Sequence, residues 1–209
     1  PESITRHLRG EAPETPKAGD PAFARVTNLV IASNVVAAEA ALNKARALGF
    51  DTLILSTYVE GEAREAGRFF AGIAREIVAH ARPLRRPACL IAGGETTVTL
   101  QGEGKGGRNQ ELALAAAFGL DGLGEGVMVI TLATDGSDGP TNAAGGIVDG
   151  TTLTRARALA LNPWAYLFEN DSYHFLAHLG DLIVTGPTGT NVNDLTFVFV
   201  NGEDSSGAG

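Results

Sequence analysis

The sequence predicts an α/β fold, with a mixed, largely parallel sheet flanked by helices on both faces in αβα layers. Two observations predict it. Apolar segments of strand length alternate along the chain with longer segments of helical periodicity, which is typical of parallel strands joined by crossover helices. The last two apolar segments, DLIVTG and DLTFVFV, have no helix between them, and this favours a mixed sheet.

The first 24 residues are predicted to be a lead-in, with a short helix in PESITRHLRG and a proline-rich linker in EAPETPKAGDPA. Val26–Ser33 (VTNLVIAS) predicts a buried strand. Ser33 or Asn34 can cap a helix over residues 37–48. Gly49 closes this helix, because glycine readily adopts the left-handed conformation found at helix ends.

The next two elements are a strand, Asp51–Tyr58, and a long helix over residues 60–82 that Pro83 ends. The helix carries an apolar stripe of Phe69, Phe70, Ile73, Ile77 and Val78. Residues 87–100 then predict a third strand and leave room for a fourth.

The second half continues the alternation. Its predicted elements are a helix over 108–120, a strand Val127–Asp135, short helices Thr151–Leu161 and Ser172–Leu179, closing strands over 181–186 and 194–200, and a flexible tail, GEDSSGAG. We find no internal repeat. We expect one α/β domain over residues 25–209, with a single continuous sheet.

Charge and composition exclude several classes of function. The net charge is −8, and residues 91–209 hold 14 Asp or Glu but only 4 Lys or Arg, so nucleic-acid binding is not expected. No apolar run approaches the ~20 residues of a membrane span. A single cysteine, Cys89, excludes an internal disulfide and favours a reducing, cytoplasmic location. The chain begins at Pro1 without a signal-peptide pattern, so we expect a processed start or a piece of a longer protein.

Glycine is concentrated in two places, with six glycines from Gly93 to Gly107 and five from Gly136 to Gly150. Glycine destabilises regular elements but lets a backbone approach a ligand closely. In α/β sheets ligands bind beyond the carboxyl ends of the strands. Three small-residue loops are expected there, and each has a functional and a purely structural interpretation.

The first loop lies within Ala92–Glu111 and leads into a helix that begins near Arg108. A helix N-terminus, together with Lys105 and Arg108, predicts an anion site, and a guanidinium can hold a carboxylate or phosphate with two hydrogen bonds. Gly102, Gly104 and Gly107 match G-x-G-x-x-G, a weak indication of dinucleotide binding. A solvated hairpin loop is the structural alternative.

The second loop, Ala133–Gly146, follows a strand and contains Asp135 and Asp138. These carboxylates suit Mg²⁺ or the proton of a substrate hydroxyl, and an ordinary turn explains the pattern equally well. The third loop, Thr185–Asp194, offers Thr190 and Asn191 for a phosphate, although a tight connection between strands is the more economical interpretation.

Three further side chains are not assigned to chemistry. His174 and His178 lie four residues apart, but HFLAH lacks the Glu of a zinc-binding H-E-x-x-H motif. Cys89 lies in an apolar strand without a basic neighbour, so we expect a core thiol rather than a nucleophile.

Four long segments of the sequence resemble one family. They are SNVVAAEAALNKARALGFDTLILSTYVEGEAREAG, GGETTVTLQGEGKGGRNQELALA, ATDGSDGPTNAAGGIVDG and NDSYHFLAHLGDLIVTGPTGTNVNDL. They resemble, in order, the C-terminal half of the class II glycerate 2-kinases, and residues 93–200 resemble the MOFRL domain. The resemblance implies a further N-terminal α/β domain, which we expect to be absent from this sequence, and an active site in the cleft between the two domains.

The resemblance implies a kinase that transfers phosphate from ATP to the 2-hydroxyl of D-glycerate with Mg²⁺. Its partners would be D-glycerate, the nucleotide and the N-terminal domain, and the sequence leaves a homo-oligomer open. On this interpretation Arg108, Asp135 and Asp138 are catalytic, and Glu95 and Asp135 are the metal ligands. The expected substrate and nucleotide contacts are Gly94, Glu95, Thr96, Lys105, Asn109, Gly189, Thr190 and Asn191.

Two alternatives to the kinase remain open. One is an NAD(P)-dependent hydroxypyruvate reductase, which rests on the G-x-G-x-x-G match. The other is a non-catalytic ligand-binding module. If the kinase prediction holds, we expect the chain by itself to fold but to turn over substrate poorly or not at all.

Overall fold

The computed structural model describes residues 1–11 and 15–202. The expected linker falls partly, and the expected tail almost wholly, outside these residues. Contacts divide the chain into two units, Pro1–Ile31 and a unit that begins at Ala32. The first contains α1 (Glu2–Leu8), as expected for its opening residues, and a 3-10 helix, Pro21–Phe23. The second, called here the sheet unit, contains every strand described below.

Six strands form one sheet in the order β1-β2-β6-β3-β4-β5. Only β1 and β2 run parallel; each of the other four neighbouring pairs is antiparallel. The strands are β1 (Asp51–Val59), β2 (Ala88–Gly94), β3 (Gly124–Ala133), β4 (Gly145–Gly150), β5 (Leu182–Ile183) and β6 (Asp194–Val200).

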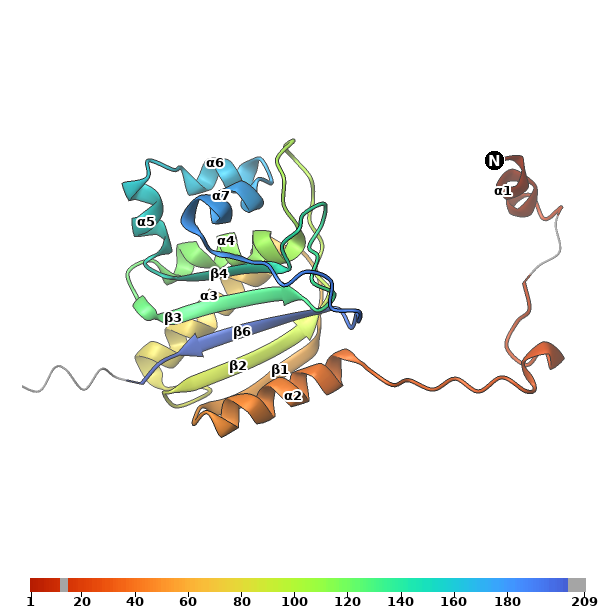
Figure 1. The fold of residues 1–209 in the computed structure, drawn as a ribbon, viewed down its shortest axis with the longest axis horizontal. Coiled ribbons are helices and arrows are strands. Elements are labelled where there is room, and N and C mark those ends of the chain that lie inside the picture. Colours follow the sequence, from red (N-terminus) through yellow and green to blue (C-terminus); the bar gives the residue numbers. More distant parts are fainter. Residues whose placement is uncertain (12–14, 203–209) are drawn as a thin grey trace, which may run out of the picture. The chain divides into compact units, whose positions relative to one another are not determined.

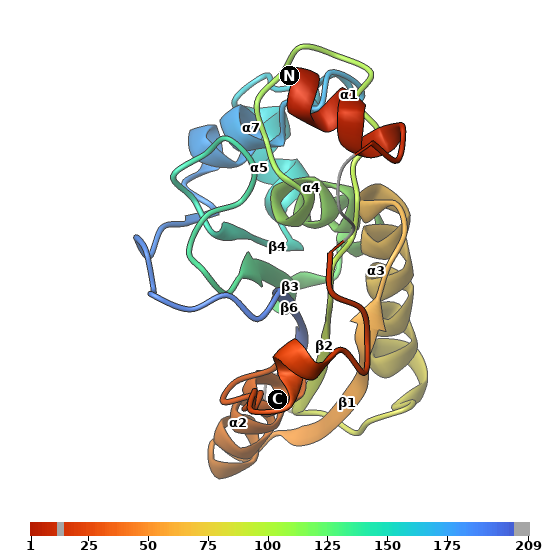
Figure 2. The ribbon, with the colours of Figure 1, turned by 90° about the vertical axis from the view of Figure 1, so that its right-hand side faces the viewer.

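Helices cover both faces of this sheet. α2 (Asn34–Ala47) packs on β1 and β2, whereas α3 (Ala63–His80) and α4 (Arg108–Leu120) pack on the opposite face (Figure 1). Figure 2 shows α3 and α4 side by side. Three short helices, α5 (Thr152–Ala158), α6 (Pro163–Phe168) and α7 (Ser172–Leu179), pack against α4. Within the described residues no helix has the length and apolar character needed to cross a membrane.

The mixed sheet and the αβα layers are confirmed, but the prediction that the sheet is largely parallel is wrong. Parallel neighbours need a crossover connection between them. Only α3, between β1 and β2, provides one for adjacent strands. β3 returns to β4 through a loop without a helix, and β6 inserts antiparallel between β2 and β3.

Strand alternation decides which helix each side chain meets. Cys89 and Ile91 of β2 face α2, whereas Leu90 of the same strand faces the α3–α4 layer. Cys89 is fully buried, as expected of a core thiol. The close packing of α3 on α4 depends on Gly67, where a Cβ atom would lie 2.3 Å from the carbonyl oxygen of Leu112.

Several local predictions need correction. Val26–Ser33 is not a strand: it has no ladder partner among the described residues, and its apolar side chains are exposed. The fourth strand expected within 87–100 is reduced to a single bridge between Glu62 and Thr97. Phe69 is 58% exposed and does not belong to the buried stripe of its helix. β4 and α6 had not been predicted.

The structure explains why the sequence of β4, GGIVDG, has glycines where a strand pattern is expected. Gly145 lies so close to β3 that a Cβ atom would be 1.9 Å from the carbonyl oxygen of Thr131. The glycine is required by close strand packing rather than by a turn. The helix ends follow the sequence more simply: the Ser33 hydroxyl caps α2, and Gly49 follows it with φ of +89°.

Candidate functional site

The carboxyl ends of β1, β2 and β3 meet the amino end of β6 at one edge of the sheet. The strand register pairs Gly94 with Val59 and with Asp194, and it pairs Asp194 also with Ala133. The three loops singled out in the sequence all border this edge. Gly94 has φ of +147°, and a Cβ atom there would lie 2.2 Å from the carbonyl oxygen of Val59, so only glycine fits.

Arg108, the first residue of α4, lies at the centre of this edge between two carboxylates. Its Nε and Nη2 donate to the two oxygens of Asp194, at 2.5 and 3.1 Å, and its Nη1 donates to Glu95 at 2.7 Å. A guanidinium has five N–H donors, so donors remain for a ligand. The structure therefore brings together Arg108, Glu95 and one residue that the sequence analysis had not singled out, Asp194.

In the Arg108–Asp194 pair the pKa values of both groups are raised, but for different reasons. The hydrogen bond to Asp194 raises the pKa of Arg108, which stays charged. Burial raises the pKa of Asp194 above its ordinary value, and the guanidinium opposes this shift without outweighing it. Asp194 is only 6% exposed. A buried carboxylate that accepts two hydrogen bonds from one guanidinium holds that guanidinium in a fixed orientation.

Asp138 occupies the N-terminus of α4, which the sequence had indicated as an anion site. Its carboxylate accepts the backbone N–H groups of Asn109 and Gln110, at 3.2 and 2.9 Å, and the Asn109 side-chain amide at 3.3 Å. Burial raises its pKa to about 6, although the N–H donors act in the opposite direction. While Asp138 stays in place, these two backbone donors are not open to a phosphate.

Asn109, which was predicted to contact the substrate, is instead buried and bonded to protein groups. It is 2% exposed, its amide donates to Asp138, and its carbonyl oxygen accepts the hydroxyl of Thr131 on β3. Both ends of the side chain are thus occupied by protein groups. Asn109 ties α4 to the sheet below Arg108, rather than extending into the open part of the edge.

The glycine-rich part of the first loop is fastened to the corner between α6 and α7. Asn170 Oδ1 accepts the N–H groups of Gln101 and Gly102, Gly104 N–H donates to the Glu169 carbonyl, and Lys105 N–H donates to Asp171. These amides are therefore not available to a pyrophosphate. The ammonium of Lys105 lies 4.5 Å from the centre of the Tyr173 ring.

Close packing explains the glycines of the G-x-G-x-x-G match. A Cβ atom at Gly102 or Gly104 would lie 2.4 Å from backbone atoms of Glu169. At Gly107 it would lie 2.3 Å from the carboxyl carbon of Asp138. The spacing therefore reflects contact with neighbouring protein segments, and it weakens the dinucleotide-binding alternative.

An ion pair between α3 and α4 supports the corner between α6 and α7. Arg64 of α3 contacts the carboxylate of Glu111 at 2.7 Å, and the second oxygen of Glu111 accepts the Asn170 amide at 2.9 Å. Glu111 is 2% exposed. The sequence analysis missed this pair, and the available signal was a glutamate directly before the apolar part of its helix, LALAAAFGL.

The second and third loops are bonded to each other at the exposed part of the edge. The Asn191 amide donates to Asp135 at 2.9 Å, and the Ser137 N–H group donates to the other carboxylate oxygen of Asp135. Thr188 joins the same loops through its hydroxyl, which donates to the Thr134 carbonyl. Gly189 and Thr190 lie beside Asn191, both exposed, and Gly189 has φ of +77°.

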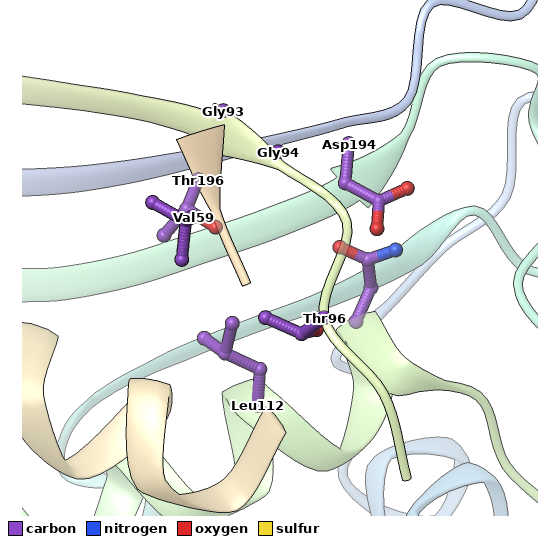
Figure 3. A pocket seen from close by; sticks show the side chains of 8 residues that line it. Val59, Gly93, Gly94, Thr96, Leu112, Asp194 and Thr196 are labelled. Atoms are coloured by element: carbon purple, nitrogen blue, oxygen red, sulfur yellow. The ribbon is translucent and has the colours of Figure 1, made fainter. Parts of the chain in front are cut away.

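Three hollows surround Arg108 and its partners. A cavity of about 10 Å³, with room for roughly one water, lies beneath the edge. Figure 3 shows Asp194, Thr96 and Leu112 bordering it from β6, the loop after β2 and α4. A hollow of about 500 Å³ opens on the α4 side, where Thr96, Arg108 and Asp138 line it. Another of about 340 Å³ opens on the β1 side.

The hollow on the β1 side has a different chemistry. It is lined by Ser33, Asn34, Val35, Thr57, Tyr58, Glu60, Gly94, Glu95 and Asn193. None of these lining residues is basic. Gly94, Glu95 and Thr96 were predicted to contact the substrate, and this segment borders both hollows. The hollow on the α4 side is lined by a guanidinium, whereas the hollow on the β1 side is lined only by acidic and neutral residues.

The two expected metal ligands, Glu95 and Asp135, bond to different partners, Arg108 and Asn191. Over residues 1–11 and 15–202, no three His, Cys, Asp or Glu side chains converge as a metal centre requires. The donor set does not fit a resident metal ion. His174 contacts Asp171 at 2.6 Å.

Comparison with known proteins places these features in a family. The model of the MOFRL family matches residues 88–194. The chain is 56% identical over 151 residues to the D-glycerate 2-kinase of Thermotoga maritima, covering 72% of this chain and 36% of that protein. It is 46% identical to the glycerate 2-kinase of Pyrococcus horikoshii, covering 96% and 46%, and 44% identical to a putative hydroxypyruvate reductase of Agrobacterium vitis, covering 96% and 45%.

The crystal structure of the Thermotoga maritima glycerate kinase superposes with a TM-score of 0.82 at 44% identity, over 95% of this chain and 50% of that one. The chain thus spans half or less of the length of these relatives. The chain belongs to the MOFRL family, and the resemblance to glycerate 2-kinases is confirmed.

Proposed function

We propose that this member of the MOFRL family supplies one side of the active site of an ATP-dependent glycerate 2-kinase. The observation that carries the proposal is Arg108, which Asp194 and Glu95 hold at the wall of the α4-side hollow, within the segment that matches the family. Phosphoryl transfer requires positioning and charge stabilisation more than covalent chemistry. A guanidinium with unused donors, fixed by a buried carboxylate, suits that requirement.

In the proposed reaction the 2-hydroxyl oxygen of D-glycerate forms a bond to the γ-phosphorus of ATP. The bond from that phosphorus to the β–γ bridging oxygen breaks, ADP leaves, and the hydroxyl proton passes to a carboxylate. Arg108 binds the glycerate carboxylate or a phosphate oxygen from the α4-side hollow. Asp135 is partly exposed, and we favour it as the proton acceptor because Asp138 already accepts three N–H groups.

The charge of this edge indicates that the site needs further groups. The edge carries one arginine, Arg108, and four carboxyl groups, those of Glu95, Asp135, Asp138 and Asp194. This excess of negative charge repels a triphosphate and a carboxylate substrate. We propose that Mg²⁺ arrives with the nucleotide as part of the substrate, and that basic side chains come from protein outside this chain. A cytoplasmic location agrees with the buried thiol of Cys89.

The test is made on the full reading frame that encodes this chain, with D-glycerate and Mg-ATP, and NMR detects 2-phosphoglycerate. Arg108→Ala is expected to lower kcat/KM by about 100-fold or more, because it removes a charged donor from the transition state. Arg157→Ala is the matched control, since Arg157 forms a surface ion pair with Asp121. The 209-residue chain alone is expected to fold and to give little or no product. An unchanged rate in Arg108→Ala removes Arg108 from the site.

Two relatives support a second candidate, because two proteins of Agrobacterium vitis carry the name putative hydroxypyruvate reductase. A parallel sample with NADH and hydroxypyruvate tests it. Oxidation of NADH without ATP, and no phosphoglycerate, would contradict the kinase. Tight nucleotide or glycerate binding with no product in either sample would instead indicate a non-catalytic module.

A further inference from the structure

The loop between β2 and α4, residues 95–107, projects from the edge of the sheet and returns to the start of α4 (Figure 1). Residues of both its outgoing arm, 96–100, and its returning arm, 104–107, line the α4-side hollow of about 500 Å³. Sites for small molecules and cofactors usually measure ~300–1,000 Å³. The hollow therefore has room for a ligand much larger than a three-carbon acid.

The outgoing arm is bonded along one side to the segment before α3. The N–H group of Thr97 donates to the Gly61 carbonyl, and the Thr97 carbonyl accepts the N–H group of Ala63, as in a pair of parallel strands. Both the N–H group and the hydroxyl of Thr99 donate to the carboxylate of Glu62. Two alternate residues thus bond to the same neighbour, which is the pattern of an extended segment.

Val98, between these two threonines, has a backbone donor and acceptor that the protein does not use. Backbone groups of successive residues in an extended segment point to opposite sides, so those of Val98 point away from residues 61–63. In the part of the chain that the structure describes, neither its N–H group nor its carbonyl has a partner. The Val98 side chain packs against the hydrophobic core, and the residue lines the hollow. A free N–H group beside a free carbonyl matches the N1 acceptor and the 6-amino donor of adenine.

Leu100 gives the same hollow an apolar wall. Its side chain is 77% exposed, although the residues on both sides of it are fastened: Thr99 to Glu62, and the N–H group of Gln101 to the Asn170 side chain at 2.7 Å. The exposed ring of Pro140 lines the hollow as well. Pockets for small molecules combine such apolar surfaces with a few fixed polar groups, so a flat, apolar ring with one polar edge suits this wall.

The charged groups of the hollow distinguish its two ends. Arg108 lines it and is its single basic lining residue. Glu111 and Asp138 line it too, but both are buried, and each accepts hydrogen bonds from protein donors. The β1-side hollow, in contrast, is lined by acidic and neutral residues alone. A ligand with a neutral base and anionic phosphates therefore fits the α4-side hollow better than the β1-side hollow.

We propose that the α4-side hollow binds the adenosine part of ATP, an inference that rests on the proposed kinase function. The adenine ring packs against Leu100 and Pro140, and its N1 and 6-amino group bond to the N–H group and carbonyl of Val98. The phosphates extend toward Arg108. On this view Arg108 serves the nucleotide phosphates rather than the carboxylate of glycerate.

Leu100→Ser in the full reading frame tests the apolar wall by steady-state kinetics. The KM for ATP is expected to rise about fivefold to tenfold, because the adenine ring loses apolar contact, while kcat and the KM for glycerate change less than about twofold. Leu159→Ser, at an exposed leucine after α5, is the matched control and should leave all three unchanged. An unchanged KM for ATP, or a rise in the KM for glycerate alone, overturns the proposal. A lower melting temperature without nucleotide, together with an unchanged KM for ATP, also overturns it and shows that protein covers Leu100.

Inosine triphosphate tests the contact with Val98. Its base carries a carbonyl in place of the 6-amino group and a proton on N1, so it would set donor against donor and acceptor against acceptor. We expect its KM to exceed that of ATP by about tenfold or more. Equal KM values for the two nucleotides overturn the proposal.

Nucleotide binding separates this inference from the kinase reaction. If phosphoglycerate forms while Leu100→Ser leaves the KM for ATP unchanged, the inference alone fails. If the full reading frame forms no phosphoglycerate, the proposed function fails, and saturation-transfer NMR with ATP then decides the inference. Transfer to the adenine ring protons that weakens in Leu100→Ser supports it, and transfer that is absent or equal in the two proteins overturns it.

Discussion

At the scale of single residues, the edge of the sheet is organised by carboxylates that are buried to different degrees. Asp194 and Asp138 are 6% and 2% exposed, and each is satisfied by donors of α4. Burying a charge is costly unless hydrogen bonds and a partner compensate it. These two aspartates therefore hold Arg108 and the first turn of α4 in place, whereas Glu95 and Asp135 remain accessible.

Replacing Asp194 by Asn tests its positioning role. The variant keeps the shape but directs an amide toward the guanidinium, so we expect a loss of about 2–3 kcal/mol in the free energy of unfolding, measured by urea denaturation. Asp121→Asn breaks the surface pair with Arg157 and should cost less than about 1 kcal/mol. Equal losses in the two variants would show that Asp194 has no special role.

The burial of Asp138 predicts a dependence of stability on pH. Its pKa in the folded protein is about 6, above the ~4 of an exposed aspartate, so between these values the folded state binds more protons than the unfolded state. This contribution to stability is therefore largest at low pH and is lost as the pH rises through about 6.

Comparison with Asp138→Asn isolates this group from the other carboxylates. From pH 7 to pH 4.5, the wild type should gain about 1–2 kcal/mol in unfolding free energy relative to the variant. Urea titrations at several pH values measure the difference. Parallel curves, or a relative loss for the wild type at low pH, would contradict the assignment.

At the scale of elements, α4 connects the layers. It packs on α3, β3, β4 and α7, and its first turn carries Arg108, Asn109 and Glu111. The loop before it is attached to the corner between α6 and α7, which Glu111 and Arg64 support from beneath. The position of Arg108 thus depends on helices that contribute no side chain to the open edge.

Gly104→Ala tests this attachment. Its Cβ atom would lie 2.4 Å from the carbonyl oxygen of Glu169, so backbone must move, and we expect a loss of about 1–3 kcal/mol in unfolding free energy. Gly72→Ala on α3 is the control with the opposite sign. It meets nothing within 4 Å, and removing a helix glycine should stabilise by about 0.5–1 kcal/mol. Thermal or urea denaturation measures both; a neutral Gly104→Ala would show that the loop can shift freely.

At the scale of the whole molecule, the charge of the candidate site is the informative feature. The site has an excess of carboxylates for anionic substrates. This excess is explained if, as proposed, this chain works together with protein outside it. The domain boundary expected after residue 24 stays a prediction, and the contacts themselves divide at Ile31.

Much of the fold was predictable because local patterns decide it. The periodicity of α3 and α4, the cap at Ser33 and the apolar strands around β2, β3 and β6 follow from neighbouring residues. β4 and α6 were missed because glycines and a short polar-flanked segment carry little local signal. The direction of the strands was misjudged, since it depends on where β6 inserts.

The candidate site, like the fold, was predicted from the sequence only in part. Arg108 and Asp135 were predicted from charge and loop position and Glu95 from the family resemblance, and the structure adds the contacts of Arg108 with Glu95 and Asp194. It also shows Asn109 and Asp138 as buried supports and Lys105 over Tyr173.

The sequence by itself determined the layered α/β class, the edge where the loops gather and the family, because these depend on periodicity, composition and long ordered motifs. Only the tertiary structure decided which carboxylate holds Arg108, what fills the N-terminus of α4 and why the glycines of the first loop are needed. Those depend on contacts such as Arg108–Asp194 and Gly104–Glu169, between residues more than 60 positions apart, which no local pattern records.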